Sequence, residues 1–346
     1  MFEVLEPGLL TTVQDRGRPA STHLGVPEGG AADRRSLAVA NLLLDNDPGA
    51  AAIEMTIVGP TLVARQRGVI AIGGADLAGR IRESGAQLVP GRTHAVGEGA
   101  TLEFPGAVDP RAGARSYLAI CGGVDVPVVL GSRSTCLAGG FGGLDGRPLA
   151  RGDRFRASSP EAGADLVGRI WPLAGDGAGS TADPAADPSG SPFRVLPGPS
   201  ISLEPRELDR LAEAIAGTTW RVAPESDRTG IRLVGPVPVT SGNASRSGIL
   251  SHGVVTGTIQ LPPDGLPIVL LVDHQTTGGY PVAAVVIAAD HDRLGQLRPG
   301  AEIGFSLVDR ETATAALVRH ATDLADALAV FREGIAWDDA WRSTRG

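Results

Sequence analysis

The segment 273–281 holds the residue types in this chain that are best suited to chemistry. It reads DHQTTGGYP, and two short apolar runs, 268–272 and 282–289, flank it. Such runs are typical of buried strands, which would hold an acid, an imidazole, an amide, two hydroxyls and a phenol in fixed positions. The glycine pair lets backbone come close to a ligand. We expect this loop to line a working site; the alternative is a tight hairpin whose polar groups satisfy their own backbone.

The candidates for catalysis are His274, Tyr280 and His252. A histidine titrates near neutral pH and can act as a general base. The candidates from this region for binding a substrate or nucleotide are Gln260, Gln275, Thr276, Thr277, Gly278 and Gly279. No HxH or HExxH spacing is present, and the two cysteines, Cys121 and Cys136, lack metal-ligand spacing, so we expect no metal.

Two further clusters have the composition of anion sites. Asp15 could orient a carboxylate or phosphate together with Arg16 or Arg18, or it could close a local turn as a salt bridge. Arg133 and Ser134 lie in the run GSRST, where a guanidinium, hydroxyls and backbone donors can converge on one anion. Arg133 is therefore our first choice for binding a phosphate, and the alternative is a polar connection with ordinary turns.

The chain contains no lysine, so all 31 of its basic residues are arginine. Compositional bias is the simplest cause, but the chemical consequence holds in any case. Biotin cannot be carried on this chain, because its attachment needs a lysine amine, and a Walker-type phosphate loop and Schiff-base catalysis are excluded too. Any phosphate must be bound by arginines, backbone N–H groups or a metal. Arg228 is a further candidate, which either reaches the cleft or pairs with Asp227.

The overall composition restricts the partners. The net charge is −8 over 346 residues and the pI is about 5.3, which argues against a nucleic-acid or anionic-membrane partner. No apolar run approaches the roughly 20 residues that span a bilayer. The opening residues, MFEV, show no secretion signal. We expect a cytoplasmic protein.

Glycine and proline are frequent and the apolar runs are short, which favours a mainly β fold of barrels or sandwiches with a few helices. Helices are expected over 31–44, from a cap at Ser202 to Gly217, and from a cap at Asp309 to about Phe331. The stretch 174–192 contains almost nothing that could be buried and reads as a linker. We therefore predict a domain over 1–190, a second over 193–308, and a helical extension over 309–346.

Several short motifs follow one another over roughly residues 1–310: PGLLTTVQDRGR (7–18), LGVP (24–27), ANLL (40–43), GGVDVP (122–127), LGSRST (130–135), RVLPGP (194–199), SDRTG (226–230) and QLRPG (296–300). In these motifs the chain resembles the carboxyltransferase-like family that includes the C-type subunit of bacterial 5-oxoprolinase, the KipA proteins, and the second subunit of allophanate-hydrolase-type and urea-carboxylase enzymes. The resemblance implies two cyclophilin-like β-barrel domains that face one cleft.

The resemblance also implies three alternative activities. The first is a subunit of an ATP-dependent 5-oxoprolinase, which hydrolyses a cyclic amide with a B-type (KipI-like) partner and a LamB-like third subunit. The second is a carboxyltransferase or allophanate-hydrolase half of a biotin-dependent system, with biotin on a separate carrier. The third is a KipA-like regulatory protein without catalysis. ATP is expected at the level of the complex.

The chain departs from the family pattern at four positions. Many members have an arginine at His274, an acid at His252, a lysine at Val282 and an aspartate at Cys136. If those charged groups bind substrate in the common members, this chain binds a different or less charged substrate.

Overall fold

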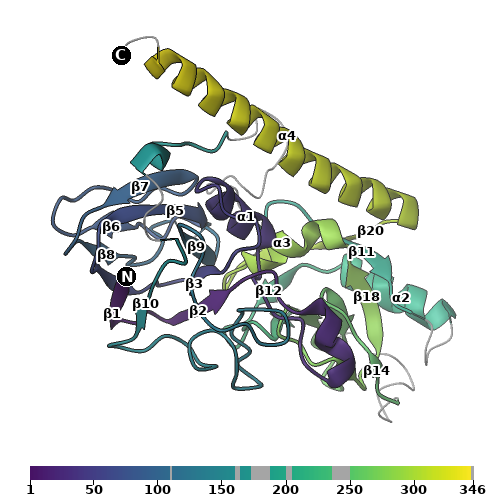
Figure 1. The fold of residues 1–346 in the computed structure, drawn as a ribbon. Helices are drawn as coiled ribbons and strands as arrows, with labels where there is room; N and C mark the ends of the chain where they lie inside the picture. Colours follow the sequence, from purple (N-terminus) through teal and green to yellow (C-terminus); the bar gives the residue numbers. More distant parts are fainter. Residues whose placement is uncertain (110, 160–163, 173–187, 200–204, 236–249, 344–346) are drawn as a thin grey trace.

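The computed structural model describes residues 1–109, 111–159, 164–172, 188–199, 205–235 and 250–343. This described part consists mainly of strands in two halves, with one long helix lying across both (Figure 1). The predicted mainly β fold is therefore confirmed. Most of the predicted linker, residues 174–187, and the predicted cap Ser202 lie outside the described residues.

Two antiparallel five-stranded sheets form the N-terminal half. The first has the order β10 (Arg154–Phe155), β1 (Phe2–Glu6), β4 (Thr61–Ala64), β8 (Thr101–Glu103) and β6 (Arg80–Ile81). The second has the order β2 (Leu10–Gln14), β3 (Ala52–Thr56), β9 (Arg115–Ile120), β5 (Gly68–Gly74) and β7 (Arg92–Val96). Alternate side chains of both sheets, among them Val4, Leu62, Ile53 and Leu118, meet in one buried core.

A helix covers the other face of the second sheet. This helix, α1 (Arg34–Leu42), begins at Asp33, whose carboxylate accepts the Ser36 N–H at 2.8 Å. Leu37 packs there with Tyr117 and Ala119, the residues of β9 that point away from the first core. Both faces of β9 are therefore buried, which explains its unbroken apolar run. Two short 3-10 turns, η1 (Pro19–Leu24) and η2 (Ala164–Leu166), complete this half.

One eight-stranded sheet forms the C-terminal half. Its order is β19 (Glu302–Ile303), β12 (Trp220–Val222), β13 (Gly230–Val234), β16 (Ile268–Leu270), β15 (Thr258–Gln260), β18 (Val282–Val286), β11 (Phe193–Pro197) and β20 (Phe305–Leu307). Only Gly304 separates the two end strands in sequence, so the sheet returns to its start as a nearly closed barrel. Closure of this kind removes exposed sheet edges. Helix α2 (Pro205–Ala216), the turn η4 (Ala288–Asp290) and helix α3 (His291–Gly295) pack around it.

The loop 273–281 is not a hairpin turn. Strand β15 lies between β16 and β18 and pairs with both, so the strands on either side of the loop are not neighbours. The hairpin alternative is therefore wrong. The loop contributes a short strand, β17 (Thr277–Gly278), which pairs with β14 (His252–Gly253) outside the barrel. The flanking strands are also shorter than predicted, ending at Leu270 and at Val286.

Helix α4 (Arg310–Ser343) lies across both halves (Figure 1). It starts as predicted after Asp309, which accepts the Thr312 N–H at 2.8 Å, but it extends beyond the predicted end at Phe331. Its first turns bury Ala316 against the C-terminal half, and further along Phe331 contacts Trp171 of the N-terminal half with ring centroids 5.2 Å apart. The helix therefore ties the halves together. No described helix is long and apolar enough to cross a membrane.

The two halves also meet at a buried arginine, Arg228. Its guanidinium binds both carboxylate oxygens of Asp273, at 2.8 and 3.0 Å, and donates to the Gly30 carbonyl at 2.6 Å and to Glu54. The exposed fractions are 2% for the Arg228 side chain and 1% for that of Glu54. Burial alone would lower the pKa of Arg228, but the Asp273 and Glu54 carboxylates raise it above its ordinary value. The guanidinium therefore stays charged and joins residues 174 positions apart.

Of the two alternatives for Arg228, pairing with Asp227 is wrong, and a role in the cleft stays a prediction. The Asp227 carboxylate accepts instead the N–H groups of Thr229 and Gly230, at 2.7 and 3.1 Å. This is an Asx-type turn, in which a short acidic side chain bonds to the backbone just ahead of it. The turn leaves the guanidinium free to reach across the junction.

We predict that Arg228→Ala destabilises the protein by about 3–5 kcal/mol, because Asp273 would stay buried without its ion-pair partner and Glu54 would keep only Arg115, at 3.7 Å. Unfolding in guanidinium chloride, followed by circular dichroism, measures the change. The matched control is Arg221→Ala, which removes an arginine that pairs with Glu302 at 2.8 Å on the surface. That variant should lie within about 1 kcal/mol of wild type. Equal effects of the two substitutions would contradict the role given to Arg228.

Candidate functional site

A cavity of about 1650 Å³ opens where the two halves and α4 meet. We call it the junction cavity; it is lined by Leu196 and by residues of the stretches 22–34, 253–256, 271–277, 285–292 and 310–320. Four of the six histidines of the chain line it: His23, His274, His291 and His320. This concentration of imidazoles marks the cavity as the candidate functional site.

His274 is held in one tautomer. Its side chain is 5% exposed, and its Nδ1 lies 2.5 Å from the Gln275 carbonyl oxygen. A carbonyl only accepts hydrogen bonds, so Nδ1 carries the proton. Burial lowers the pKa of this histidine, even though Glu28 and Asp273 lie near enough to raise it. The ring is therefore neutral at neutral pH, and its Nε2 is an acceptor.

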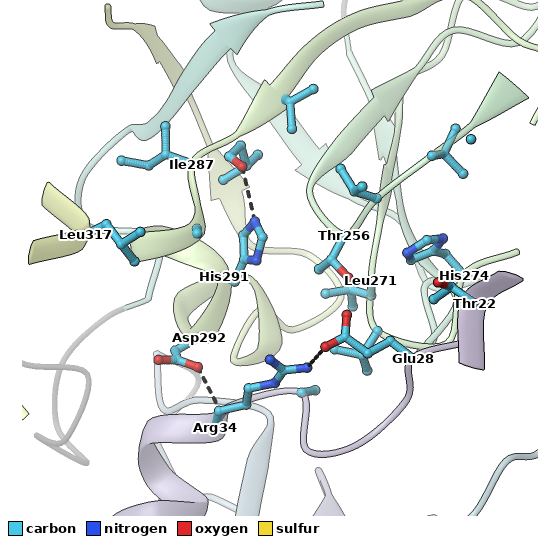
Figure 2. A pocket seen from close by; sticks show the side chains of 18 of the residues that line it. Thr22, Glu28, Arg34, Thr256, Leu271, His274, Ile287, His291, Asp292 and Leu317 are labelled. Atoms are coloured by element: carbon cyan, nitrogen blue, oxygen red, sulfur yellow. Dashed lines mark hydrogen bonds and ion pairs between the residues drawn. The ribbon is translucent and has the colours of Figure 1, made fainter. Parts of the chain in front are cut away.

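His291 is held in the opposite tautomer. Its Nε2 lies 3.1 Å from the carbonyl oxygen of Val286 and must donate to it (Figure 2). Burial lowers the pKa of His291, Asp292 and Asp290 raise it, and Arg34 lowers it. The ring is neutral as well, and its Nδ1 is the acceptor. Figure 2 shows the two imidazoles on different walls, His274 beside Thr22 and His291 beside Ile287.

Charged groups on the floor of the cavity are paired with one another. Glu28 accepts from Arg34 at 2.5 Å, and the Arg34 backbone N–H donates to Asp292 at 2.8 Å (Figure 2). His320 of α4 reaches the second oxygen of Asp292 at 3.1 Å. The N-terminal half, the C-terminal half and α4 thus share one polar network at the cavity wall.

A second carboxyl group lies behind this wall. Asp33 accepts from Ser36 Oγ and from Gln296 Nε2, both at 2.6 Å. Burial and the negative charge of Asp292 raise the pKa of Asp33 to about 7, while the hydrogen bonds from Gln296 and Ser36 oppose the rise. The pKa of Asp292 is lowered, because the His320 and backbone contacts outweigh its burial. The two carboxyl groups therefore differ in charge near neutral pH.

The structure brings only part of the predicted loop to the cavity. His274, Thr276 and Thr277 line it, whereas Gln275, Gly278, Gly279 and Tyr280 do not, and Tyr280 is 43% exposed. The other two candidates of this region, His252 and Gln260, do not line it either. His252 precedes Gly253 of the lining, and Gln260 is buried next to Gln275, with 3.3 Å between their amide groups. Their proposed roles stay predictions.

The predicted anion cluster lies elsewhere and is built differently. Asp15 forms no ion pair with Arg16 or Arg18, so the local salt bridge is wrong, although the Asp15 carboxylate does close the turn by accepting the Gly17 N–H at 2.8 Å; its role in orienting an anion stays a prediction. Its carboxylate accepts from the hydroxyls of Ser132 and Ser134, at 2.6 and 2.5 Å, and from the N–H of Arg133 at 2.6 Å. These bonds hold the turn 132–134 against the end of β2. Ser134 is completely buried in this arrangement.

Near this turn, the guanidinium groups of Arg133 and Arg18 still have N–H groups that are not used in hydrogen bonds within the described part of the chain. Arg133 donates its Nε to the Val126 carbonyl at 2.9 Å. Arg18 is 2% exposed and donates Nη2 to the Ser134 carbonyl at 2.5 Å, while its Nε and Nη1 lack a partner among the described residues. Neither arginine lines the junction cavity. Phosphate binding at Arg133 stays a prediction.

The four departures from the family pattern also separate in space. His274 lines the cavity and His252 lies at its edge. Cys136 is buried, and its backbone forms an isolated antiparallel β-bridge with Phe141. Val282 is the first residue of β18 and is 5% exposed. Among the described residues, no group of three or more His, Cys, Asp or Glu side chains is placed to hold a metal ion.

The sequence reasoning missed much of the cavity wall, namely Glu28, Arg34, His291, Asp292, Arg310 and His320. One signal was available: His291 and Asp292 come shortly after the apolar run 282–289 in the sequence, as Asp273 and His274 come after the run 268–272. The contribution of α4 had no local signal. Most of its described side chains are exposed, and its docking depends on contacts with both halves.

Residues 24–307 match the family described as "Carboxyltransferase domain, subdomain A and B". The C-type subunit of 5-oxoprolinase from Escherichia coli (strain K12) is 36% identical over 312 residues, which cover 88% of this chain and 90% of that protein. Urea amidolyase of Lachancea kluyveri is 33% identical over 90% of this chain, which spans only 17% of that protein. The crystal structure of Kluyveromyces lactis urea carboxylase superposes with a TM-score of 0.76 at 29% identity, covering 94% of this chain and 29% of that one.

We predict that Asp33→Asn changes how stability depends on pH. The pKa of Asp33 is raised from 3.8 to about 7 in the folded protein. The folded state therefore keeps a proton that the unfolded chain loses, and the free energy of unfolding falls as pH rises through this interval. Asparagine cannot titrate and still caps a helix. Between pH 4 and pH 8, the free energy of unfolding of the variant should therefore rise relative to that of wild type, by up to a few kcal/mol.

The control for this measurement is Asp309→Asn at the cap of α4. Hydrogen bonds from Thr312 lower the pKa of Asp309 below 3.8, so it contributes stability above that value and loses it only in more acidic solution. Its difference from wild type should stay constant from about pH 5 to pH 8 and change only slightly at pH 4. Denaturant titrations at each pH give both profiles, and a flat profile for Asp33→Asn would show that this carboxyl is ionised throughout.

Proposed function

Because this chain belongs to the family with the carboxyltransferase domain, subdomains A and B, we propose that it is the C-type subunit of a 5-oxoprolinase-type amidohydrolase. One observation carries the proposal: the match to the C-type subunit of the Escherichia coli 5-oxoprolinase covers 88% of this chain and 90% of that protein. The two chains therefore correspond over nearly their whole lengths. The complex would act in the cytoplasm on a small cyclic amide.

The name of that relative implies partner subunits, and the proposed complex contains a B-type and a LamB-like protein. ATP supplies the activation of the amide carbonyl that lets water attack it. We place the nucleotide at the level of the complex, because Arg34 of the cavity wall is already paired with Glu28. Arg310, at the first turn of α4, is the cavity arginine with no partner among the described residues, and it is suited to a substrate carboxylate.

In this proposal the junction cavity holds the amide. Threonine hydroxyls at 256, 276 and 277 and the two neutral imidazoles offer hydrogen bonds, and apolar residues around them, among them Leu271 and Ile287, offer apolar contacts. A neutral imidazole with a free nitrogen can take a proton from water as the carbonyl is attacked.

A carboxyltransferase role is the second candidate. It is favoured by the 33% identity to urea amidolyase and by the TM-score of 0.76 to urea carboxylase. Both of those proteins are much longer than this chain. Without a lysine, this chain would need a separate protein to carry the biotin.

We predict that the purified chain alone does not hydrolyse 5-oxoproline, whereas its complex with the B-type and LamB-like proteins of the same organism does so with ATP consumption. Phosphate release with and without 5-oxoproline measures this. Omitting each subunit in turn is the control, and only the complete set should show substrate-dependent turnover. Hydrolysis by the chain alone would contradict the proposal. Carboxylation of urea with an added biotin carrier, in place of amide hydrolysis, would favour the second candidate.

A further inference from the structure

Two histidines offer lone pairs to the same space. His274 and His291 both line the junction cavity, and each has one ring nitrogen bonded to a backbone carbonyl. The opposite nitrogens, Nε2 of His274 and Nδ1 of His291, have no protein partner among the described residues. Neither nitrogen is completely buried. The Nε2 atom of His252, in contrast, is buried without a hydrogen-bond partner in the described part of the chain. Both free nitrogens are therefore accessible, on two residues that line the cavity.

The backbone carbonyls decide what these nitrogens can do. In a neutral imidazole whose one nitrogen donates, the other nitrogen can only accept. The carbonyls of Gln275 and Val286 cannot rotate as a side chain would, so the tautomers are set by the fold. The charges that face the two rings are Glu28, Asp273, Asp290, Asp292 and Arg34, and burial still keeps both rings neutral. The cavity therefore presents two acceptors in fixed positions.

Acceptors of this kind recognise a ligand with N–H donors. A carboxylate or phosphate offers only acceptor oxygens and would face the lone pairs unfavourably, while an amide N–H matches them. We propose that the junction cavity selects its substrate through the amide N–H, which donates to the free nitrogen of His291 or His274. This inference rests on the proposed amide substrate. It adds that the histidine nitrogens recognise the N–H of that amide. The histidine that accepts this N–H is thus a specificity-determining residue.

The test is a cycle in which the ligand and the protein each lose one hydrogen-bonding group. The ligands are 5-oxoproline and N-methyl-5-oxoproline, which lacks the N–H. The proteins are the complex with wild-type chain, with His291→Phe, with His274→Phe, and with His94→Phe. His94 is the matched control, because its Nε2 bonds to the Val89 carbonyl at 2.9 Å and burial lowers its pKa, but it does not line the cavity.

N-methylation should weaken binding to the wild-type complex by at least about fivefold, the effect of one hydrogen bond left unmade. The control His94→Phe should keep this discrimination. At least one of His291→Phe and His274→Phe should lose it, because the acceptor is gone. Steric exclusion of the methyl group alone would persist in both cavity variants, and that result would overturn the inference. Calorimetry gives the affinities, and melting temperatures confirm that each variant is folded.

Conservative variants provide a rescue. The amide oxygen of asparagine can take the place of Nδ1, and that of glutamine can take the place of Nε2. His291→Asn or His274→Gln, at whichever position the phenylalanine variant loses discrimination, should recover part of it. A phenylalanine variant that loses discrimination with no recovery in its amide counterpart would point to altered packing and count against the inference.

The proposed function can fail separately. If the complete complex does not turn over 5-oxoproline, the same proteins are titrated with 2-pyrrolidone and N-methyl-2-pyrrolidone, cyclic amides without the carboxylate. Discrimination by wild type and its loss in a cavity variant would support N–H recognition although the proposed reaction is wrong. Equal affinity of wild type for the two members of both ligand pairs would overturn the inference.

Discussion

A buried positive charge between two negative charges is the interaction on which the junction depends. Arg228 lies in the C-terminal half, and it binds Asp273 of the same half and Glu54 of the other. Tyr117 and the Ala32 N–H satisfy the second oxygen of Glu54, at 2.8 and 3.0 Å. Removing one member would leave charges buried without partners, so the group is stable only as a whole. The two halves are thereby held in one relative position.

The junction cavity exists because that position is fixed. Its walls come from the segment after β2, from the loops of the barrel and from the first turns of α4, so a shift between the halves would change every wall at once. Asp273 binds Arg228, and its neighbour His274 lines the cavity. The carboxylate that binds the joining arginine is thus adjacent in sequence to a residue that lines the cavity. Rigid support of this kind is what a binding site requires.

The family match and the cavity do not cover the same residues. The match ends at 307, whereas α4 begins at Arg310 and supplies His320 and Leu317 to the cavity wall. Membership of the family therefore accounts for the two β halves and supports the class of reaction. The wall that α4 adds lies beyond the residues matched by the family model, and differences in a cavity wall are the means by which related sites select different ligands.

The sequence by itself determined the mainly β class, the cap of α4 at Asp309, the absence of a lysine and the family, because each depends on residues that are near one another in the chain or on simple composition. It also placed His274, Thr276 and Thr277 in one loop. Only the tertiary structure decided that β15 separates the strands beside that loop, that Arg228 binds Glu54 across 174 positions, and that His291 shares a cavity with His274. The physical reason is that hydrophobic periodicity encodes which face of an element is buried, but not which distant element covers it. Which element covers a face also determines which charged and polar groups meet. Asp15 therefore accepts hydrogen bonds from serines, and Asp227 bonds to the backbone instead of pairing with its neighbour Arg228.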